Sequence, residues 1–226
     1  VYIIVFISVF FILLLIAAIK TYIRKILLGK KASSESYINY LRKRGAFVGE
    51  RTTFFSPLQI SIDDTQPWLI EIGDDVQITA GVRILTHDYS WAVLKKVYGS
   101  IIGMAGSVKI GNNVFIGSDT TILGGAKIGD NVIIGAGSLV KGYIPSNCVA
   151  AGVPCKPIMT LDDFYNRRLT KYEEEAFMLV KEYIKHYGEK PFSSLCVFSL
   201  AISISAPYPA MRSSSSETSF GKSLNS

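Results

Sequence analysis

The sequence is poor in the residues that hold metals and form disulfide bonds. Its 226 residues include three cysteines and two histidines. An odd set of cysteines without a ligand spacing excludes a disulfide framework and a cysteine-based zinc site. Two histidines are also too few for a zinc centre with three histidine ligands. We therefore expect no metal site, and the unpatterned cysteines favour a reducing compartment.

Charged residues are absent from the first stretch of the chain. Residues 1–19 consist mainly of Val, Ile, Leu and Phe and carry no charge, which is typical of a membrane-spanning helix. Lys20, Arg24 and Lys25 follow directly, so the positive-inside rule orients the remaining chain toward the cytoplasm. We expect a transmembrane helix at residues 1–19, with a signal-peptide core or a buried core helix as alternatives.

Positive charge is concentrated in the next segment. Residues 20–44 contain eight Lys and Arg residues against Glu35 alone. This local charge of +7 exceeds the total of +6, so the rest of the chain carries about −1 and no nucleic-acid-binding domain is expected. We interpret residues 20–46 as a basic juxtamembrane helix attracted to anionic lipid. A solvated linker helix is the alternative.

Aliphatic residues recur every sixth position in the middle of the chain. From residue 110 to residue 140, every sixth position holds an aliphatic residue: Ile110, Ile116, Ile122, Ile128, Ile134 and Val140. A period of six is too short for a helical repeat and suits a short strand and a turn, stacked coil upon coil. The aliphatic side chains would point inward and build a continuous core. The segment therefore predicts a parallel β-helix.

The same count of six extends toward the N-terminus and then breaks. Ile60, Ile72, Ile78 and Ile84 keep the phase, whereas residues 87–107 leave it in a stretch rich in aromatic residues and glycine. A long excursion from a regular domain is usually functional. We expect the solenoid to occupy residues 47–158 and the excursion to carry function.

The C-terminal part of the chain has a different period. Thr160-Leu-Asp-Asp163 is typical of a capping box, and apolar residues follow at helical spacing. We predict a helix at residues 159–187 that covers exposed coils of the solenoid. Residues 188–226 are rich in serine and lack a period, so we expect a disordered tail.

His87 is the candidate for acid–base chemistry. It follows the expected strand Arg83-Ile-Leu-Thr86 directly, at the start of the excursion and next to Asp88. An imidazole at such a position can act as a general base near neutral pH. The second histidine, His186, falls on the last predicted helix, where we interpret it as structural.

These motifs together resemble a known family. The hexads, Thr86-His87-Asp88, Ile134-Gly-Ala-Gly-Ser138 and the ending Ala151-Gly-Val-Pro-Cys-Lys156 are similar to the left-handed β-helix, or hexapeptide-repeat, acyltransferases. The likeness covers about residues 37–185. It is greatest to the maltose/galactoside/serine O-acetyltransferase group, and especially to acetyltransferases of bacterial surface-polysaccharide synthesis. It implies an all-β fold, a left-handed parallel β-helix, and a homotrimer that binds acetyl-CoA between adjacent solenoids.

The resemblance also implies the site residues. His87 matches the general base, and Ser56 stands where relatives carry an asparagine that stabilises the oxyanion; a backbone N–H is the alternative donor. Asp64 and Asp88 would bind the acceptor. Six residues would bind the coenzyme: Phe115, Gly117, Ser118, Ala136, Lys141 and Lys156.

The expected function is acetyl-CoA-dependent transfer of an acetyl group to a hydroxyl of a sugar or surface-polysaccharide precursor. A membrane anchor at residues 1–19 favours a lipid-linked glycan acceptor, with the catalytic domain on the cytoplasmic side of a bacterial inner membrane. A sugar amine, serine or a xenobiotic alcohol is the alternative acceptor. A non-catalytic solenoid scaffold is the alternative outside the enzymes.

Overall fold

The structure is a computed structural model that describes residues 2–188. The chain divides into two units after Asn166, and each is described by itself. The prediction of a disordered tail at residues 188–226 lies outside the described residues, apart from Gly188.

The N-terminal helix is longer than the predicted membrane segment. Helix α1 (Tyr2–Leu28) runs without a break through Lys20, Arg24 and Lys25, because leucine, lysine and arginine are all good helix formers. Within residues 2–188, no helix combines the length and the apolar character needed to cross a membrane. The predicted transmembrane helix at residues 1–19 is therefore not supported, and residues 2–19 belong to the longer helix α1.

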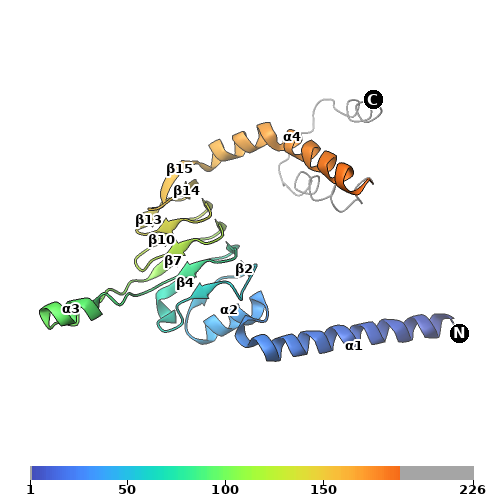
Figure 1. Cartoon of the computed structure of the whole chain (residues 1–226), viewed down its shortest axis with the longest axis horizontal. Helices are drawn as coiled ribbons and strands as arrows, with labels where there is room; N and C mark the ends of the chain where they lie inside the picture. Colours follow the sequence, from blue (N-terminus) through green and yellow to red (C-terminus); the bar gives the residue numbers. More distant parts are fainter. Residues whose placement is uncertain (1, 189–226) are drawn as a thin grey trace. The chain divides into compact units, whose positions relative to one another are not determined.

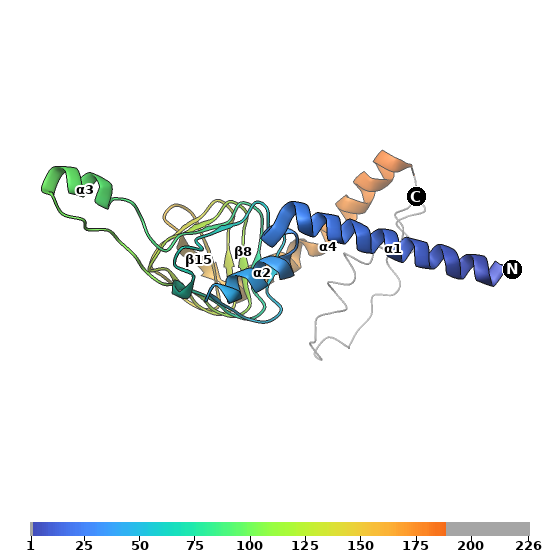
Figure 2. The same cartoon turned by 90° about the horizontal axis from the view of Figure 1, so that it is seen from below.

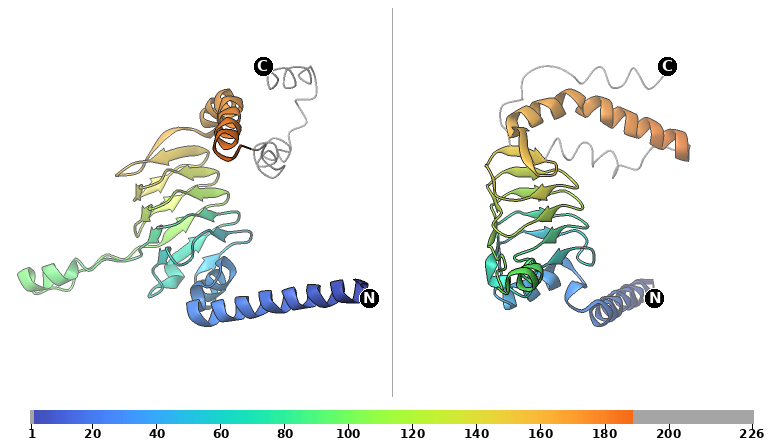
Figure 3. Two further views of the ribbon diagram at one scale, coloured as in Figure 1. Left: turned by 45° about the vertical axis from the view of Figure 1, so that its right-hand side comes forward. Right: turned by 60° about the vertical axis from the view of Figure 1, so that its left-hand side comes forward.

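After α1 the chain passes through η1 (Gly29–Lys31) and α2 (Ser34–Lys43) into coils of short strands that form three sheets (Figures 1 and 3). The first sheet contains β1 (Phe47–Val48), β4 (Ile70–Ile72), β7 (Val108–Ile110), β10 (Lys127–Ile128) and β13 (Tyr143–Ile144). The second contains β2 (Thr53–Phe54), β5 (Gln77–Ile78), β8 (Val114–Ile116), β11 (Val132–Ile134), β14 (Cys148–Ala151) and β15 (Lys156–Thr160). The third contains β3 (Ser61–Ile62), β6 (Arg83–Ile84), β9 (Thr121–Ile122) and β12 (Leu139–Val140).

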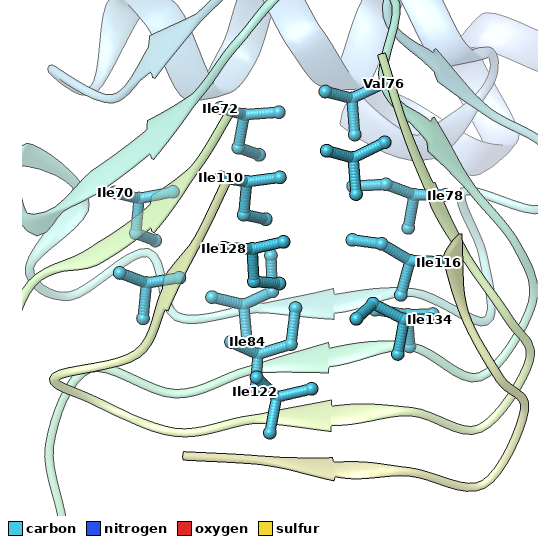
Figure 4. Close-up of a cluster of buried hydrophobic side chains, with 14 of the residues drawn as sticks. Ile70, Ile72, Val76, Ile78, Ile84, Ile110, Ile116, Ile122, Ile128 and Ile134 are labelled. Atoms are coloured by element: carbon cyan, nitrogen blue, oxygen red, sulfur yellow. The ribbon is translucent and has the colours of Figure 1, made fainter. Parts of the chain in front are cut away.

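The core of the solenoid is a set of aliphatic columns. Ile72, Ile110 and Ile128 lie in register on successive strands of the first sheet, and all three are buried (Figure 4). Each buried isoleucine stabilises the fold by roughly 1.5–3 kcal/mol relative to exposure. Among the described residues, all strand pairs are parallel except β14 with β15. The predicted parallel β-helix is confirmed.

Asparagines mark one corner of the coils. Asn113, Asn131 and Asn147 all have a positive φ, between 53° and 58°, which asparagine tolerates better than most residues. Their side chains form a ladder: Asn113 Nδ2 donates to Asn131 Oδ1 at 2.8 Å, and Asn131 Nδ2 donates to Asn147 Oδ1 at 2.9 Å. These residues therefore make the turn and also link one coil to the next.

The first coil is covered by α2. Tyr37, Ile38 and Leu41 of this helix are buried, and the Tyr37 ring meets the Phe54 ring edge-on at 5.5 Å between centroids. The helix begins with a side-chain cap, because Ser33 Oγ accepts a hydrogen bond from Ser36 N at 3.1 Å. Helix α2 thus closes the N-terminal end of the core.

The predicted C-terminal helix is present as α4 (Leu161–Tyr187). The N-cap half of its capping box is confirmed, since Asp163 N donates to Thr160 Oγ1 at 3.1 Å. Thr160 Oγ1 in turn donates to Asp163 Oδ2 at 2.7 Å. In the second unit, Arg168 forms two hydrogen bonds to Glu175. The predicted role of this helix as a cover for the coils stays a prediction.

Two segments depart from the regular coils. One is the short helix η2 (Pro67–Leu69), which directly follows Gln66, the position between Ile60 and Ile72 where the count of six lacks an aliphatic residue. The other is the arm formed by residues 87–107, whose two chain segments leave β6 and return to β7, with α3 (Trp91–Tyr98) between them (Figure 2). The base of the arm is held by Gly106 N, which donates to Thr86 O at 2.8 Å, and by Asp88 N, which donates to Met104 O at 3.1 Å.

Candidate active site

His87 lies at the base of the arm, immediately after the buried residue Thr86. It pairs with Ala105 in an antiparallel bridge, so its backbone is held between the arm and the coils. The His87 side chain is 22% exposed. The imidazole is therefore fixed by its surroundings and still open to a ligand.

The imidazole is paired with a carboxylate from the preceding coil. His87 Nδ1 lies 2.7 Å from Asp63 Oδ2, and the Asp63 side chain is only 7% exposed. Asp63 follows β3, and β3 pairs with β6, which leads to His87. Stacking of two coils therefore brings together an acid and a histidine that are 24 residues apart in sequence.

Asp63 is held as an anion by its neighbours. Its carboxylate accepts hydrogen bonds from Thr65 N at 3.0 Å, from Thr65 Oγ1 at 2.6 Å and from Thr86 N at 3.3 Å, and also from Thr86 Oγ1. Burial alone raises the pKa of Asp63, but these hydrogen bonds outweigh it and hold the pKa well below its usual range. With an ionised acceptor at Nδ1, a neutral imidazole keeps its proton there and presents Nε2 as a base.

Asp63 was not predicted from the sequence, because the count of six was carried through its one misfit, at Gln66. That count keeps Ile60 in phase with Ile84, whereas the structure pairs Ile62 with Ile84. Both Ile60 and Ile62 are buried, so the pattern of aliphatic residues does not distinguish the two registers. The shift of two residues is what places Asp63 beside His87. The Asp63–Asp64 pair itself was the available signal in the sequence.

The two predicted acceptor-binding acids, Asp64 and Asp88, form hydrogen bonds to residues other than His87. Asp64 Oδ2 accepts hydrogen bonds from Lys30 Nζ at 2.6 Å and Tyr40 Oη at 2.7 Å, and these bonds lower the pKa of Asp64. Asp88 Oδ1 accepts hydrogen bonds from Ser90 Oγ at 2.7 Å and Ser90 N at 3.1 Å, which lower the pKa of Asp88. Their role in acceptor binding stays a prediction.

Ser56, the predicted oxyanion donor, lies in the turn between β2 and β3. Its carbonyl oxygen accepts a hydrogen bond from Gln59 N at 2.9 Å, and its side chain is half-buried. Across residues 2–188, no hydrogen bond joins the Ser56 hydroxyl to His87 or to any other group. The hydroxyl is therefore able to donate to a ligand, and its catalytic role stays a prediction.

Aromatic side chains border His87 on the arm. The Tyr89 ring lies 5.5 Å from the imidazole between centroids, and the Trp91 ring lies 6.1 Å from that of Tyr89. Tyr89 is exposed. Exposed aromatic surface next to a reactive group is typical of a binding site. The aromatic content of the excursion was the sequence signal for these residues.

Three of the predicted coenzyme residues lie on adjacent coils at one corner. Gly117 and Ser118 follow β8, and Ala136 follows β11, the strand paired with β8. Gly117 allows the coils to approach closely, because a Cβ there would stand 2.5 Å from Ala136 N. Ala136 is exposed. The corner thus presents a narrow surface of small side chains.

Replacing Gly117 with alanine is expected to destabilise the fold by roughly 1–3 kcal/mol, because the added methyl group meets backbone that cannot move aside easily. Thermal unfolding followed by circular dichroism measures the loss. Gly103→Ala is the matched control, since its Cβ would meet only the Trp91 side chain, at 3.3 Å. Equal melting temperatures for Gly117→Ala and the unchanged chain would contradict this packing.

The other predicted coenzyme residues lie on separate elements. Phe115 points outward from the second sheet and lines a cavity of about 170 Å³ with residues that include Asn113 and Asn131. Lys141 follows β12 of the third sheet, and Lys156 begins β15. Both lysines are exposed. One chain therefore does not gather the six residues into one cavity.

Comparisons with known proteins agree with the repeat pattern. The family described as bacterial transferase hexapeptide (six repeats) matches residues 107–142. Protein CapG of Staphylococcus aureus is 37% identical over 150 residues, which are 62% of this chain and 86% of that protein. Galactoside O-acetyltransferase of Escherichia coli is 38% identical over 110 residues, 49% of this chain and 52% of that protein. The solved structure of a maltose O-acetyltransferase from Clostridium difficile is 31% identical, with a TM-score of 0.40 over 56% of this chain and 75% of that chain.

Proposed function

The chain belongs to the hexapeptide-repeat acetyltransferases, and from that premise we propose that it transfers the acetyl group of acetyl-CoA to a hydroxyl of a sugar or surface-polysaccharide precursor. The observation that carries the proposal is the pairing of His87 with Asp63 at the base of the arm. A related protein named for acetyl transfer to galactosides supports a sugar as the acceptor class.

His87 acts as the general base in the proposed reaction. Its Nε2 takes the proton from the acceptor hydroxyl while the acceptor oxygen forms a bond to the thioester carbonyl carbon. The tetrahedral intermediate collapses when the carbon–sulfur bond breaks, and the imidazolium returns the proton to the leaving sulfur. The products are an acetyl ester and free CoA. Asp63 holds the ring through Nδ1 and stabilises the imidazolium.

Three further groups have proposed roles around this pair. The Ser56 hydroxyl donates to the oxyanion of the tetrahedral intermediate, with a backbone N–H as the alternative donor. Asp64 and Asp88 bind hydroxyls of the acceptor. Support for Ser56 comes from its unused hydroxyl, and support for the two acids comes from their ionised state.

The coenzyme runs along the outer surface of the coils. Gly117, Ser118 and Ala136 allow its slender arm to lie against the backbone, and Phe115 packs beside it. Lys141 and Lys156 hold its phosphate groups, since an ammonium is a suitable partner for phosphate. The small side chains at one corner and the exposure of both lysines support this arrangement.

We expect a homotrimer with active sites between subunits. Support comes from the scattered coenzyme residues and from exposed apolar side chains on the arm, which include Val97, Ile101 and Ile102. Light scattering of the purified chain should give three times the mass of one chain. A monomer that is fully active would contradict sites shared between subunits.

The proposed place of action is the cytoplasmic face of a bacterial inner membrane. Support comes from the exposed apolar side chains of α1 and from the basic residues that follow them. An acceptor linked to lipid is presented at such a surface. This location favours a glycan precursor over serine or a xenobiotic alcohol.

An acceptor screen tests the reaction. Thiol release from acetyl-CoA is followed with galactosides, amino sugars, serine and a lipid-linked glycan, and products are identified by mass. We expect an acetyl ester on a sugar hydroxyl. Hydroxylamine cleaves such an ester, whereas it leaves an amide intact. A hydroxylamine-stable product would instead assign acetyl transfer to a sugar amine. No thiol release with any acceptor would favour the non-catalytic scaffold.

A further inference from the structure

A basic cavity lies at the junction of α1, η1 and α2, apart from the candidate active site. It has a volume of about 400 Å³. Its walls include three lysines and three uncharged polar side chains: Lys25, Lys30, Lys43, Ser36, Asn39 and Tyr40. No acidic side chain lines it. Its lining therefore consists of groups that donate hydrogen bonds and carry positive charge.

The cavity occupies the face of α2 that the core does not use. Tyr37, Ile38 and Leu41 are buried against the first coil, whereas Ser36, Asn39, Tyr40 and Lys43 recur at intervals of three and four residues on another face. Packing of the core accounts for the first set. It does not account for the polar set, which is available to a ligand.

Two of the three lysines are uncompensated. Lys30 is held by Asp64, at 2.6 Å, and by the Tyr40 ring, at 4.1 Å from its centroid. Within residues 2–188, neither Lys25 nor Lys43 makes a hydrogen bond or an ion pair. Two ammonium groups that face one cavity repel each other, and an anion between them relieves that repulsion. Phosphate oxygens suit such donors.

An apolar surface leads directly to this cavity. The side chains at residues 10–19 of α1 are exposed, among them Phe10, Phe11 and Leu14. Exposed apolar surface of this extent marks a protein or membrane contact. An apolar helix that ends in lysines matches a lipid surface, where acyl chains lie beneath a layer of phosphate.

We infer that α1 inserts its apolar residues into a membrane surface and that the cavity binds head-group phosphates of anionic lipid. Lys25 and Lys43 supply the attraction, and Lys30 and Tyr40 shape the wall. The same two residues also hold Asp64, the neighbour of Asp63. This inference goes beyond acetyl transfer and does not depend on it.

Vesicle flotation of the full chain tests the inference. The vesicles contain either phosphatidylcholine alone or phosphatidylcholine with phosphatidylglycerol. The unchanged chain should bind the anionic vesicles more tightly than the neutral ones. The double variant Lys25→Gln/Lys43→Gln should bind the anionic vesicles about 25-fold less tightly, since each lysine near a membrane surface contributes roughly a factor of five.

The matched control is Lys127→Gln/Lys171→Gln, which removes the same charge from exposed positions on β10 and α4. It should retain the affinity of the unchanged chain. An equal loss in both double variants would show a general charge effect and overturn the cavity assignment, as would an equal affinity for the two kinds of vesicle. Glycerol phosphate is the third arm: if it binds the cavity while neither kind of vesicle binds the chain, the ligand is a small phosphate rather than a lipid surface.

Discussion

Replacing His87 with alanine is expected to lower kcat for acetyl transfer by roughly 10²–10⁴-fold, the usual contribution of a positioned general base. Nε2 of His87 is the only atom of the His87–Asp63 pair that faces an acceptor in the proposed reaction. Without it, the acceptor hydroxyl must lose its proton to water as the new bond forms. Release of thiol from acetyl-CoA measures the effect.

The loss should appear in kcat rather than in KM for acetyl-CoA, because His87 acts on the proton in the transition state and makes no proposed contact with the coenzyme. His186→Ala is the control, since that histidine is exposed on α4 and contacts the Tyr187 ring. Circular dichroism and light scattering check that the fold and assembly are retained. Equal turnover by the unchanged chain and His87→Ala would remove His87 from catalysis.

Asp63→Asn is expected to have the other large effect, a fall in kcat of up to about 10⁴-fold, on the precedent of the acid that orients histidine in serine proteases. An asparagine of the same shape can donate to Nδ1, and that donation moves the imidazole proton to Nε2. The unprotonated nitrogen of His87 is then Nδ1, which faces residue 63 and not the acceptor. Thiol release again gives kcat, and Asp75→Asn is the control, since Asp75 pairs with Arg51 on the surface.

The split between kcat and KM distinguishes an orienting role from a merely structural one. An orienting residue acts through the imidazole, so Asp63→Asn should lower kcat and leave KM for acetyl-CoA unchanged. A variant that is only less stable would keep the kcat of the unchanged chain per folded molecule. A normal kcat would separate Asp63 from catalysis altogether.

The pKa of Asp63 also predicts how stability changes with pH. Its pKa in the folded chain is below that of an exposed carboxyl, so the folded state binds fewer protons than the unfolded state in acid. The stabilisation from Asp63 is therefore present above the pKa of the unfolded carboxyl and is lost as the pH falls through the acidic range. The difference in melting temperature between the unchanged chain and Asp63→Asn should therefore become smaller as the pH is lowered through the acidic range.

The regular part of the molecule could be predicted from the sequence, because its physical requirement is local and repeated. Each coil must place an aliphatic residue inward on each of its strands, and Ile110, Ile116 and Ile122 satisfy that requirement directly. The cap of α4 was predictable for the same reason, since Thr160 and Asp163 bond to each other within one turn. The position of His87 followed from the place where the repeat stops.

The tertiary structure was needed to identify the acid that pairs with His87 and the face of α2 that lines the cavity. The length of chain between β3 and β6 sets how the two coils stack, and that length is not a multiple of six. Only the stacked coils show that Ile62 rather than Ile60 pairs with Ile84, and hence that Asp63 reaches the imidazole. Likewise, the basic charge of residues 20–44 is visible in the sequence, but only the packing of α2 leaves Lys25 and Lys43 facing one cavity.

Residue order is enough to predict the β-helix, the helix that follows it and the histidine at the break in the repeat, because each depends on spacing along the chain. The acid that orients that histidine and the lysines that share a cavity could be identified only from the folded chain. Both depend on contacts between coils or helices whose register is set by the lengths of irregular connections, and a periodic pattern carries no information about those lengths.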